Sequence, residues 1–251
     1  MEQLREALAV KTVMNNLFAA SSVKVKRAVK HIQELEELLA RHEAEHPPVV
    51  TVTQSEQGRV ERIHVASKAP PTCFSAIVGD VVHNLRASLD LMAVELVTIT
   101  SPELSTKSVH FPFSEVATGL ESAIKRRDFH RAGDDAVTLL KSLQPYKGGN
   151  AALRGLHDLD TKDKHSALIP DAATIVTPMV RANTDNFPDI YIEMVEGTLP
   201  DVKTVFPKDS PFGGEEIIPT LHGLIDLTER ILESFRSLVA DRQTTDSLSS
   251  S

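Results

Sequence analysis

The sequence predicts a mainly α-helical fold of the α+β class: a helical bundle that carries a small antiparallel β appendage. Apolar residues recur at every third or fourth position in several long segments, short β-branched runs lie between them, and paired prolines separate the segments. The chain has 251 residues, of which 41% are hydrophobic and 25% charged, and this composition suits one sizeable core. We therefore expect a single helical domain over residues 1–242 and a disordered, serine-rich tail over 243–251.

Helical periodicity marks the first segment, which we expect to end near residue 45, before a pair of prolines. Its basic run at 24–30 is followed by glutamates one or two turns later, which indicates solvated helix charges rather than a phosphate contact. Two β-branched runs, at 49–53 and 60–65, then flank a polar stretch that ends in a glycine. This pattern predicts a β-hairpin insertion near 49–66.

A central helix is expected around residues 74–96. Beyond it, apolar periodicity predicts helices near 134–143, 153–169 and 219–240. Asn150 precedes the second of these, and we expect it to act as the N-cap. A β-rich segment near 172–206 is punctuated by proline, asparagine and glycine. We expect its strands to form a small sheet that includes the early hairpin.

Composition and charge exclude several classes of protein. The single cysteine, Cys73, excludes an intramolecular disulfide framework, and no apolar run approaches the ~18 residues that span a bilayer. We expect a cytoplasmic protein that enters no membrane and binds no cofactor. The net charge of -8 and the aromatic content of 4% argue against a general nucleic-acid binder with a stacking platform. A basic patch can still contact nucleic acid locally, and a second basic cluster lies at 125–131.

The run from Gly79 to Asp90 places polar side chains on a helix that is otherwise apolar almost all round. At about 100° of rotation per residue, His83, Arg86 and Asp90 gather in a narrow arc. An unpaired buried polar group costs on the order of 1–3 kcal/mol, so these side chains must be paired or hydrogen-bonded. The central helix therefore indicates a site. The other side of this helix is one apolar stripe, formed by Phe74, Val78, Val81, Leu85, Leu89, Met92 and Leu96.

A second polar constellation occupies the helix that is expected after Asn150. Asp160 and Asp163 lie toward the apolar side of that helix and need a counter-charge, which either Lys164 or Arg86 supplies. We therefore predict that the two polar helices face each other across a seam of His, Arg and Asp side chains. Arg86 should then lie within about 4 Å of Asp160 or Asp163.

The polar seam has three interpretations. The first is a structural ion-pair network. The second is a functional site in which Arg86 holds a phosphate while His83 or His165 acts as acid or base. The third is a metal site. Metal binding is disfavoured, because His83 and Asp90 are about 10.5 Å apart along a helix whereas ligand bonds are about 2.0–2.2 Å long. We expect no metal site, and the sequence leaves the structural and functional interpretations open.

These motifs resemble an uncharacterised family of bacterial and phage proteins. The resemblance covers most of the chain to about residue 170 and is carried by Gly79-Asp-x-x-His83-Asn84-Leu-Arg86-x-x-Leu-Asp90, Phe111-Pro-Phe113, Leu143-Gln-Pro-Tyr146 and Leu156-His157-Asp-Leu-Asp160-x-x-Asp163-Lys164-His165. The chain is also similar to HEPN helical bundles, many of which are dimeric ribonucleases of toxin and anti-phage systems.

The HEPN resemblance implies a metal-independent ribonuclease that forms a homodimer and acts on RNA. In HEPN ribonucleases an arginine and a histidine on one helix are separated by four to six residues, whereas Arg126 and His130 are one residue too close, and neither Arg86 nor Arg154 has a histidine at that spacing. The rival hypothesis is a non-catalytic interaction or scaffold module with a structural His/Arg/Asp network. The expected catalytic residues are His83, Arg86 and His165, and the expected binding residues are Asn84, Asp90, His157, Asp160, Asp163 and Lys164.

Overall fold

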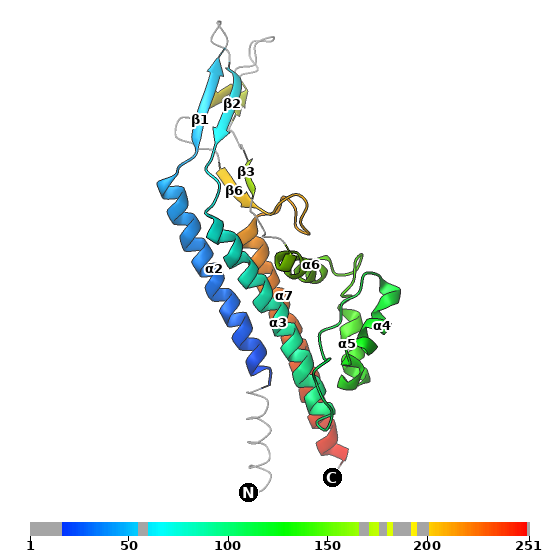
Figure 1. Cartoon of the computed structure of the whole chain (residues 1–251). Coiled ribbons are helices and arrows are strands. Elements are labelled where there is room, and N and C mark those ends of the chain that lie inside the picture. The colour runs from blue at the N-terminus through cyan, green and yellow to red at the C-terminus, as the bar shows by residue number, and fades with distance from the viewer. Residues whose placement is uncertain are drawn as a thin grey trace.

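The fold is described by a computed structural model of the chain (Figure 1). It describes the backbone of residues 17–54, 60–165, 171–175, 180–182, 192–194 and 201–249, and the side chains of residues 17–49, 66–163 and 203–245. The helices of this part are α2 (Ala19–Glu45), α3 (Thr72–Thr100), α4 (Leu120–Arg126), α5 (Asp134–Ser142), α6 (Ala151–His165) and α7 (Ile217–Ser249). Its strands are β1 (Val49–Gln54), β2 (Val60–Ala66), β3 (Asp171–Ile175), β4 (Val180–Ala182), β5 (Ile192–Met194) and β6 (Asp201–Val205).

The protein is mainly helical, as the sequence predicts, and its helices pack together. The long helices α2, α3 and α7 lie side by side, while the shorter α4, α5 and α6 pack on one flank (Figure 1). Helix α3 is the hub of this arrangement, because it contacts α2, α6 and α7. A helix that packs against neighbours on several sides must be apolar almost all round, which is what the sequence of α3 provides.

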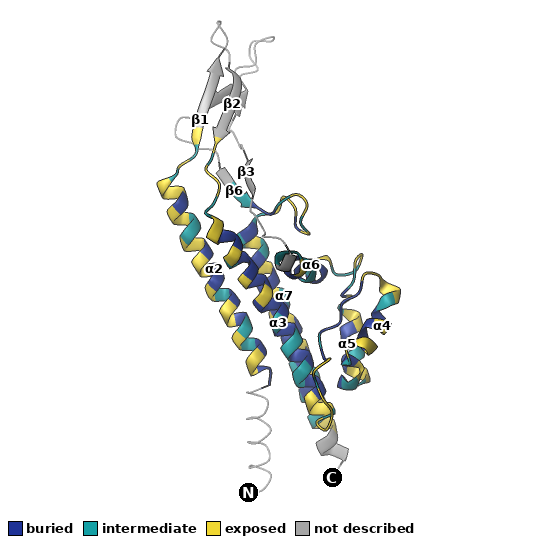
Figure 2. Cartoon of the chain, in the orientation of Figure 1, coloured by how far each residue is buried: buried dark blue, intermediate teal, exposed yellow. Residues whose placement is uncertain are grey.

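The predicted apolar stripe of α3 is confirmed as core. Figure 2 shows that buried residues follow α3 along most of its length, whereas α2 exposes one face. Burying one large aliphatic or aromatic side chain contributes about 1.5–3 kcal/mol to the stability of the fold. The core of the bundle therefore rests on α3. Its fully buried stripe consists of Phe74, Val78, Val81, Leu85, Leu89, Met92 and Leu96.

The strands pair two by two. β1 pairs with β2 in antiparallel register from Val49 opposite Ala66 to Gln54 opposite Val60. β3 pairs with β6, and β4 pairs with β5, both antiparallel. In the described part of the chain these pairs are not joined to one another, so the expectation of one small sheet that includes the hairpin is wrong.

Two segments differ from the sequence-based prediction. Helix α4 was not predicted, because its seven residues are too few to display a helical period. Residues 243–249 were expected to be disordered, yet they continue α7. Just before them, Arg242 anchors the helix: its Nε atom donates to Asp135 over 2.7 Å and its Nη2 atom donates to the carbonyl of Ala132 over 2.7 Å.

Among the described residues, no helix combines the length and the apolar character that crossing a membrane requires.

Candidate functional site

The polar arc of α3 faces the polar side of α6, as the sequence predicts. His83 contacts Asp160, and Gly79, one turn before His83, lies against Asp163. The two helices run antiparallel at this seam, since moving back along α3 corresponds to moving forward along α6. The register therefore places Arg86 beside His157, and both side chains line one pocket.

His83 and Asp160 form a hydrogen-bonded pair. The Nδ1 atom of His83 lies 3.1 Å from Oδ1 of Asp160. The imidazole is 55% exposed, whereas the Asp160 side chain is 6% exposed. A buried carboxylate thus holds one ring nitrogen of an exposed histidine, an arrangement that orients an imidazole for proton transfer at its other nitrogen.

Gly79 lies against the side chain of Asp163 on α6. A Cβ atom at position 79 would overlap the carboxylate group of Asp163, so no larger residue fits without displacing that side chain. This contact gives a packing reason for the glycine that opens the polar run of α3. It also explains why a helix-weakening residue is placed near the start of the buried α3.

Arg86 contacts Asp90 rather than Asp160 or Asp163, so the predicted ion pair across the seam is corrected. Its Nη1 atom lies 2.7 Å from Oδ1 of Asp90, one turn later on α3. Its Nη2 atom donates to the carbonyl of Phe111 over 3.3 Å. The same oxygen of Asp90 accepts a hydrogen bond from the Phe111 amide over 2.8 Å. Arg86 and Asp90 therefore fix the loop that follows α3, and Asp90 is within reach of Arg86 because residues four apart on a helix are neighbours.

His157 lies at the inner wall of the pocket. Its ring stacks on Phe113, with centroids 4.4 Å apart and planes inclined by 10°, while the guanidinium of Arg86 lies 4.7 Å from the centre of the same Phe113 ring. Burial, together with the positive charges of Arg86 and Arg154, lowers the pKa of His157 to about 4. The imidazole is therefore neutral at pH 7, and its buried Nδ1 atom has no hydrogen-bond partner.

Arg154 ties α6 to the loop that carries Phe113. Its Nε atom donates to Asp158 over 2.9 Å, its Nη1 atom donates to the carbonyl of Ser114 over 2.6 Å, and its Nη2 atom donates to Glu115. Hydrogen bonds from Lys147 and Arg154 lower the pKa of Glu115 to about 2. The guanidinium of Arg154 is thus engaged by protein groups on three sides.

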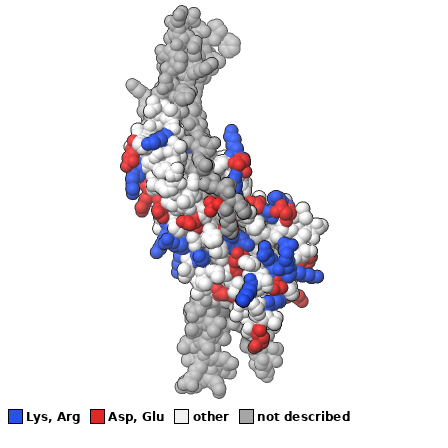
Figure 3. Space-filling model, viewed as in Figure 1, with Lys and Arg blue, Asp and Glu red and all other residues white. Residues whose placement is uncertain are grey.

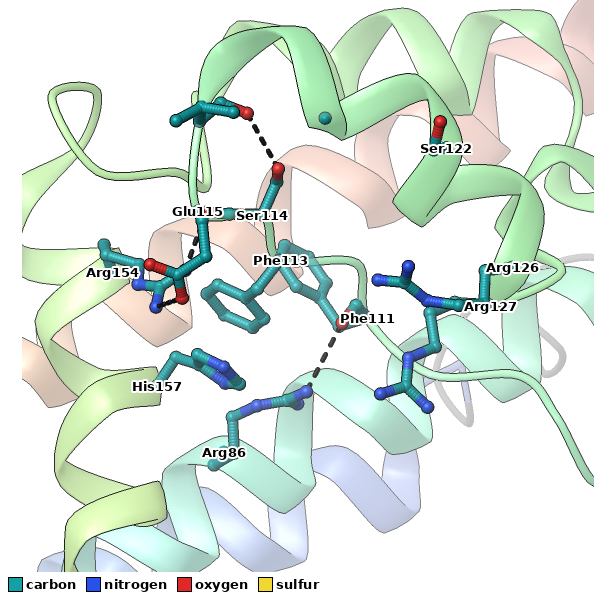
Figure 4. Close-up of a pocket in the computed structure, with 12 residues that line it drawn as sticks. Arg86, Phe111, Phe113, Ser114, Glu115, Ser122, Arg126, Arg127, Arg154 and His157 are labelled. Carbon is teal, nitrogen blue, oxygen red and sulfur yellow. Dashed lines mark hydrogen bonds and ion pairs between the residues drawn. The ribbon is translucent and has the colours of Figure 1, made fainter.

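These side chains surround a pocket of about 420 Å³ between α3, α4, α6 and the loop after α3 (Figure 4). Arg126 and Arg127, at the end of α4, reach toward the side where Arg86 and Phe111 lie. Both arginines are exposed, and neither makes an ion pair in the described part of the chain. The lining consists of Arg86, Phe111, Phe113, Ser114, Glu115, Val116, Gly119, Ser122, Arg126, Arg127, Arg154 and His157.

The surface around the pocket carries both signs of charge. In the view of Figure 3, Lys and Arg side chains lie around α4 with acidic side chains among them. The basic run Lys125 to Arg127 is visible in the sequence. The run itself does not indicate that it lies at the end of a helix beside Arg86. Arg126, Arg127 and Arg154 were consequently missing from the predicted site.

The remaining predicted residues are placed in two ways. The amide of Asn84 donates to the carbonyl of Asp80 over 2.7 Å, so this side chain bonds to its own helix. Lys164 and His165 belong to the last turn of α6, but their side chains lie outside the described residues, and their predicted roles stay predictions. Within the described part, no group of three or more His, Cys, Asp or Glu side chains is arranged to hold a metal ion.

Arg41 and His46 are a further arginine and histidine close in the chain, with four residues between them. Arg41 is exposed near the end of α2, and His46 follows that helix directly. The Nε2 atom of His46 lies 2.9 Å from Nζ of Lys68.

No family model matches the chain, and neither a curated protein nor a solved structure matches it.

Proposed function

We propose that the protein binds RNA through phosphate groups, which enter the pocket lined by Arg86, Arg126 and Arg127. One observation carries the proposal: two exposed arginines without carboxylate partners project into a pocket of about 420 Å³ whose inner wall carries a third, buried arginine. A guanidinium group presents a planar fork of N–H donors that matches phosphate oxygens, so converging arginines are typical of phosphate recognition. The volume falls within the range of about 300–1,000 Å³ that is common for ligand pockets.

The catalytic part of the proposal assigns acid or base chemistry to His83. Side chains three residues apart on a helix are neighbours, so His83 lies one turn from Arg86 and the pocket. Its hydrogen bond to the buried Asp160 holds the imidazole in place while the other face stays open to water. We assign the chain to the HEPN-like helical bundles with a β appendage, as an RNA-directed, homodimeric protein of a phage or defence setting.

RNA binding is tested with a fluorescein-labelled single-stranded RNA and fluorescence anisotropy. We expect Arg126→Ala/Arg127→Ala to weaken binding at least tenfold, because both groups that carry uncompensated charge are removed. The matched control is Arg27→Ala/Lys30→Ala, which removes the same charge from exposed positions on α2 and should change binding less than twofold. Equal binding by the wild type and the pocket variant contradicts the proposal.

Cleavage is tested with the same RNA in EDTA, followed by denaturing electrophoresis. His83→Ala and Asp160→Asn should slow cleavage, and His165→Ala tests the second predicted histidine. Arg41→Ala/His46→Ala tests the arginine and histidine near the end of α2. If only this last variant loses cleavage, the catalytic residues lie at the end of α2 and not at His83. If the wild type does not cleave RNA, the enzymatic part of the proposal is wrong.

A scaffold function is the second candidate, and the bonding of Arg154 favours it. This buried arginine is saturated by Asp158, Ser114 and Glu115, which is the pattern of a residue that fixes helix and loop positions. A scaffold function would not use the unpaired side chains of Arg126 and Arg127 in the pocket. Wild-type protein that fails to bind RNA would therefore favour this function.

A further inference from the structure

The charges that line the pocket leave a defined surplus. Arg86 is balanced by Asp90, at 2.7 Å. Arg154 contacts Asp158 at 2.7 Å, and Glu115 contacts both Arg154 and Lys147. These three cations thus face three carboxylates.

Arg126 and Arg127 have no such partner within the described residues, so the lining carries an uncompensated charge of about two units. A phosphodiester inside an RNA strand carries one negative charge, whereas a phosphate monoester carries about 1.5 to 2 at pH 7. The surplus at the pocket therefore matches a monoester better than a diester.

The negative charge beside the pocket also favours a single terminal phosphate. Glu115 lies at the pocket with its carboxylate held in the charged form by Lys147 and Arg154. A second phosphate placed beside this carboxylate would be repelled. The chain as a whole has a net charge of -8, so it provides no general track for a polyanion.

We infer that the pocket takes a dianionic phosphate monoester, the terminal phosphate of an RNA strand or of a free nucleotide, with Arg126 and Arg127 as the groups that neutralise it. The inference rests on the proposed function for the RNA strand as its carrier. Arg86 and Phe113 form the wall against which the phosphate and the first sugar lie.

The experiment is a competition titration. The wild-type protein is loaded with a fluorescein-labelled RNA that bears a 5′-phosphate. It is then titrated with unlabelled RNA of the same sequence ending in 5′-phosphate, in 3′-phosphate or in hydroxyls only, with a nucleoside 5′-monophosphate, and with inorganic phosphate. The same series is run on Arg126→Ala/Arg127→Ala and on the control Arg27→Ala/Lys30→Ala.

We expect one phosphorylated end to compete at least tenfold better than the hydroxyl-only RNA, with this preference lost in the pocket variant and kept in the control. Equal competition by phosphorylated and hydroxyl-only RNA overturns the inference while the RNA-binding function stands. If a direct titration shows binding of the nucleoside monophosphate but not of any RNA, the monoester site stands and the RNA function falls. Binding of none of these probes overturns both.

Discussion

The Nδ1 atom of His83 lies 3.1 Å from Oδ1 of Asp160, and this contact sets the register of α3 against α6. Gly79 and Asp163 meet one turn away in one direction, and Arg86 and His157 line the pocket one turn away in the other. The polar residues of the two helices are therefore ordered along a single seam. One end of that seam is closed by the carboxylate packed on the glycine, and the other end opens into the arginine-lined pocket.

The contact between Gly79 and Asp163 predicts a defined effect of adding one methyl group. Gly79→Ala should be less stable than this type of substitution usually is in a helix, by about 1 kcal/mol, because the new Cβ forces the Asp163 carboxylate to move. Gly223→Ala on α7 is the matched control: no atom lies within 4 Å of its added Cβ. It should raise stability by about 0.5–1 kcal/mol through helix propensity.

Urea unfolding of both variants measures this difference. In a double-mutant cycle, Asp163→Ala should cost less in the Gly79→Ala background than in the wild type, because the displaced carboxylate is gone. If Gly79→Ala is as stable as Gly223→Ala, the register derived from this contact is wrong.

Arg86 is predicted to stabilise the fold as well as the pocket. Arg86→Ala should lower the free energy of unfolding by about 3 kcal/mol, at the low end for a broken buried pair because Asp90 keeps some contact with water. A loss of this size corresponds to a fall in Tm of about 6–12 °C for a chain of this length. Thermal melts test it, with Arg126→Ala as an exposed control that should leave Tm within about 1 °C of the wild type. An unchanged Tm for Arg86→Ala contradicts the bonding described for this side chain.

The lowered pKa of His157 predicts that the protein loses stability in mild acid. Burial, with the charges of Arg86 and Arg154, lowers its pKa to about 4 in the folded protein, while an unfolded histidine titrates near 6.5. Between these values the unfolded chain binds a proton that the folded protein excludes, so stability is full above pH 6.5 and falls as the pH drops toward 4. The contribution is at most about 2–3 kcal/mol, because the ring keeps partial contact with solvent.

Urea unfolding at pH 7, 6, 5 and 4.5 measures this effect. His157→Gln removes the titrating group and should flatten the profile over this interval, whatever its stability at pH 7. If the wild type and His157→Gln lose stability in parallel, the environment of His157 differs from the one described.

The fold was predictable from the sequence where one helix buries a long stripe. The period of Val78, Leu85 and Leu89 identified α3, and the Asn150 side chain caps α6 as expected by accepting the Leu153 amide over 3.0 Å. The hairpin of β1 and β2 was also predictable, from its two β-branched runs. The pairing of β3 with β6 and the position of α4 were not predictable, because they depend on contacts between segments that are separate in the chain.

The candidate site was predictable in outline only. The residue types on α3 and α6 indicated a polar seam. The partner predicted for Arg86 was Asp160 or Asp163, whereas the structure pairs it with Asp90, because periodicity does not decide between a partner on the same helix and one on another. Arg126 ends the short helix α4 and Arg127 follows it directly, and both contribute to the pocket only through the packing of the bundle. Charge alone did not separate them from the solvated basic run on α2.

The salt dependence of RNA binding tests the central claim most directly, since it measures whether Arg126 and Arg127 contact phosphate. The dissociation constant of a labelled 5′-phosphorylated RNA is measured between 50 and 200 mM salt for the wild type, Arg126→Ala/Arg127→Ala and Arg27→Ala/Lys30→Ala. The account predicts that the slope of log K against log salt concentration is shallower by roughly 1–2 in the pocket variant, because each lost phosphate contact removes about one unit of slope. The slope of the control variant should equal that of the wild type. A slope that is the same for the wild type and the pocket variant would contradict the account.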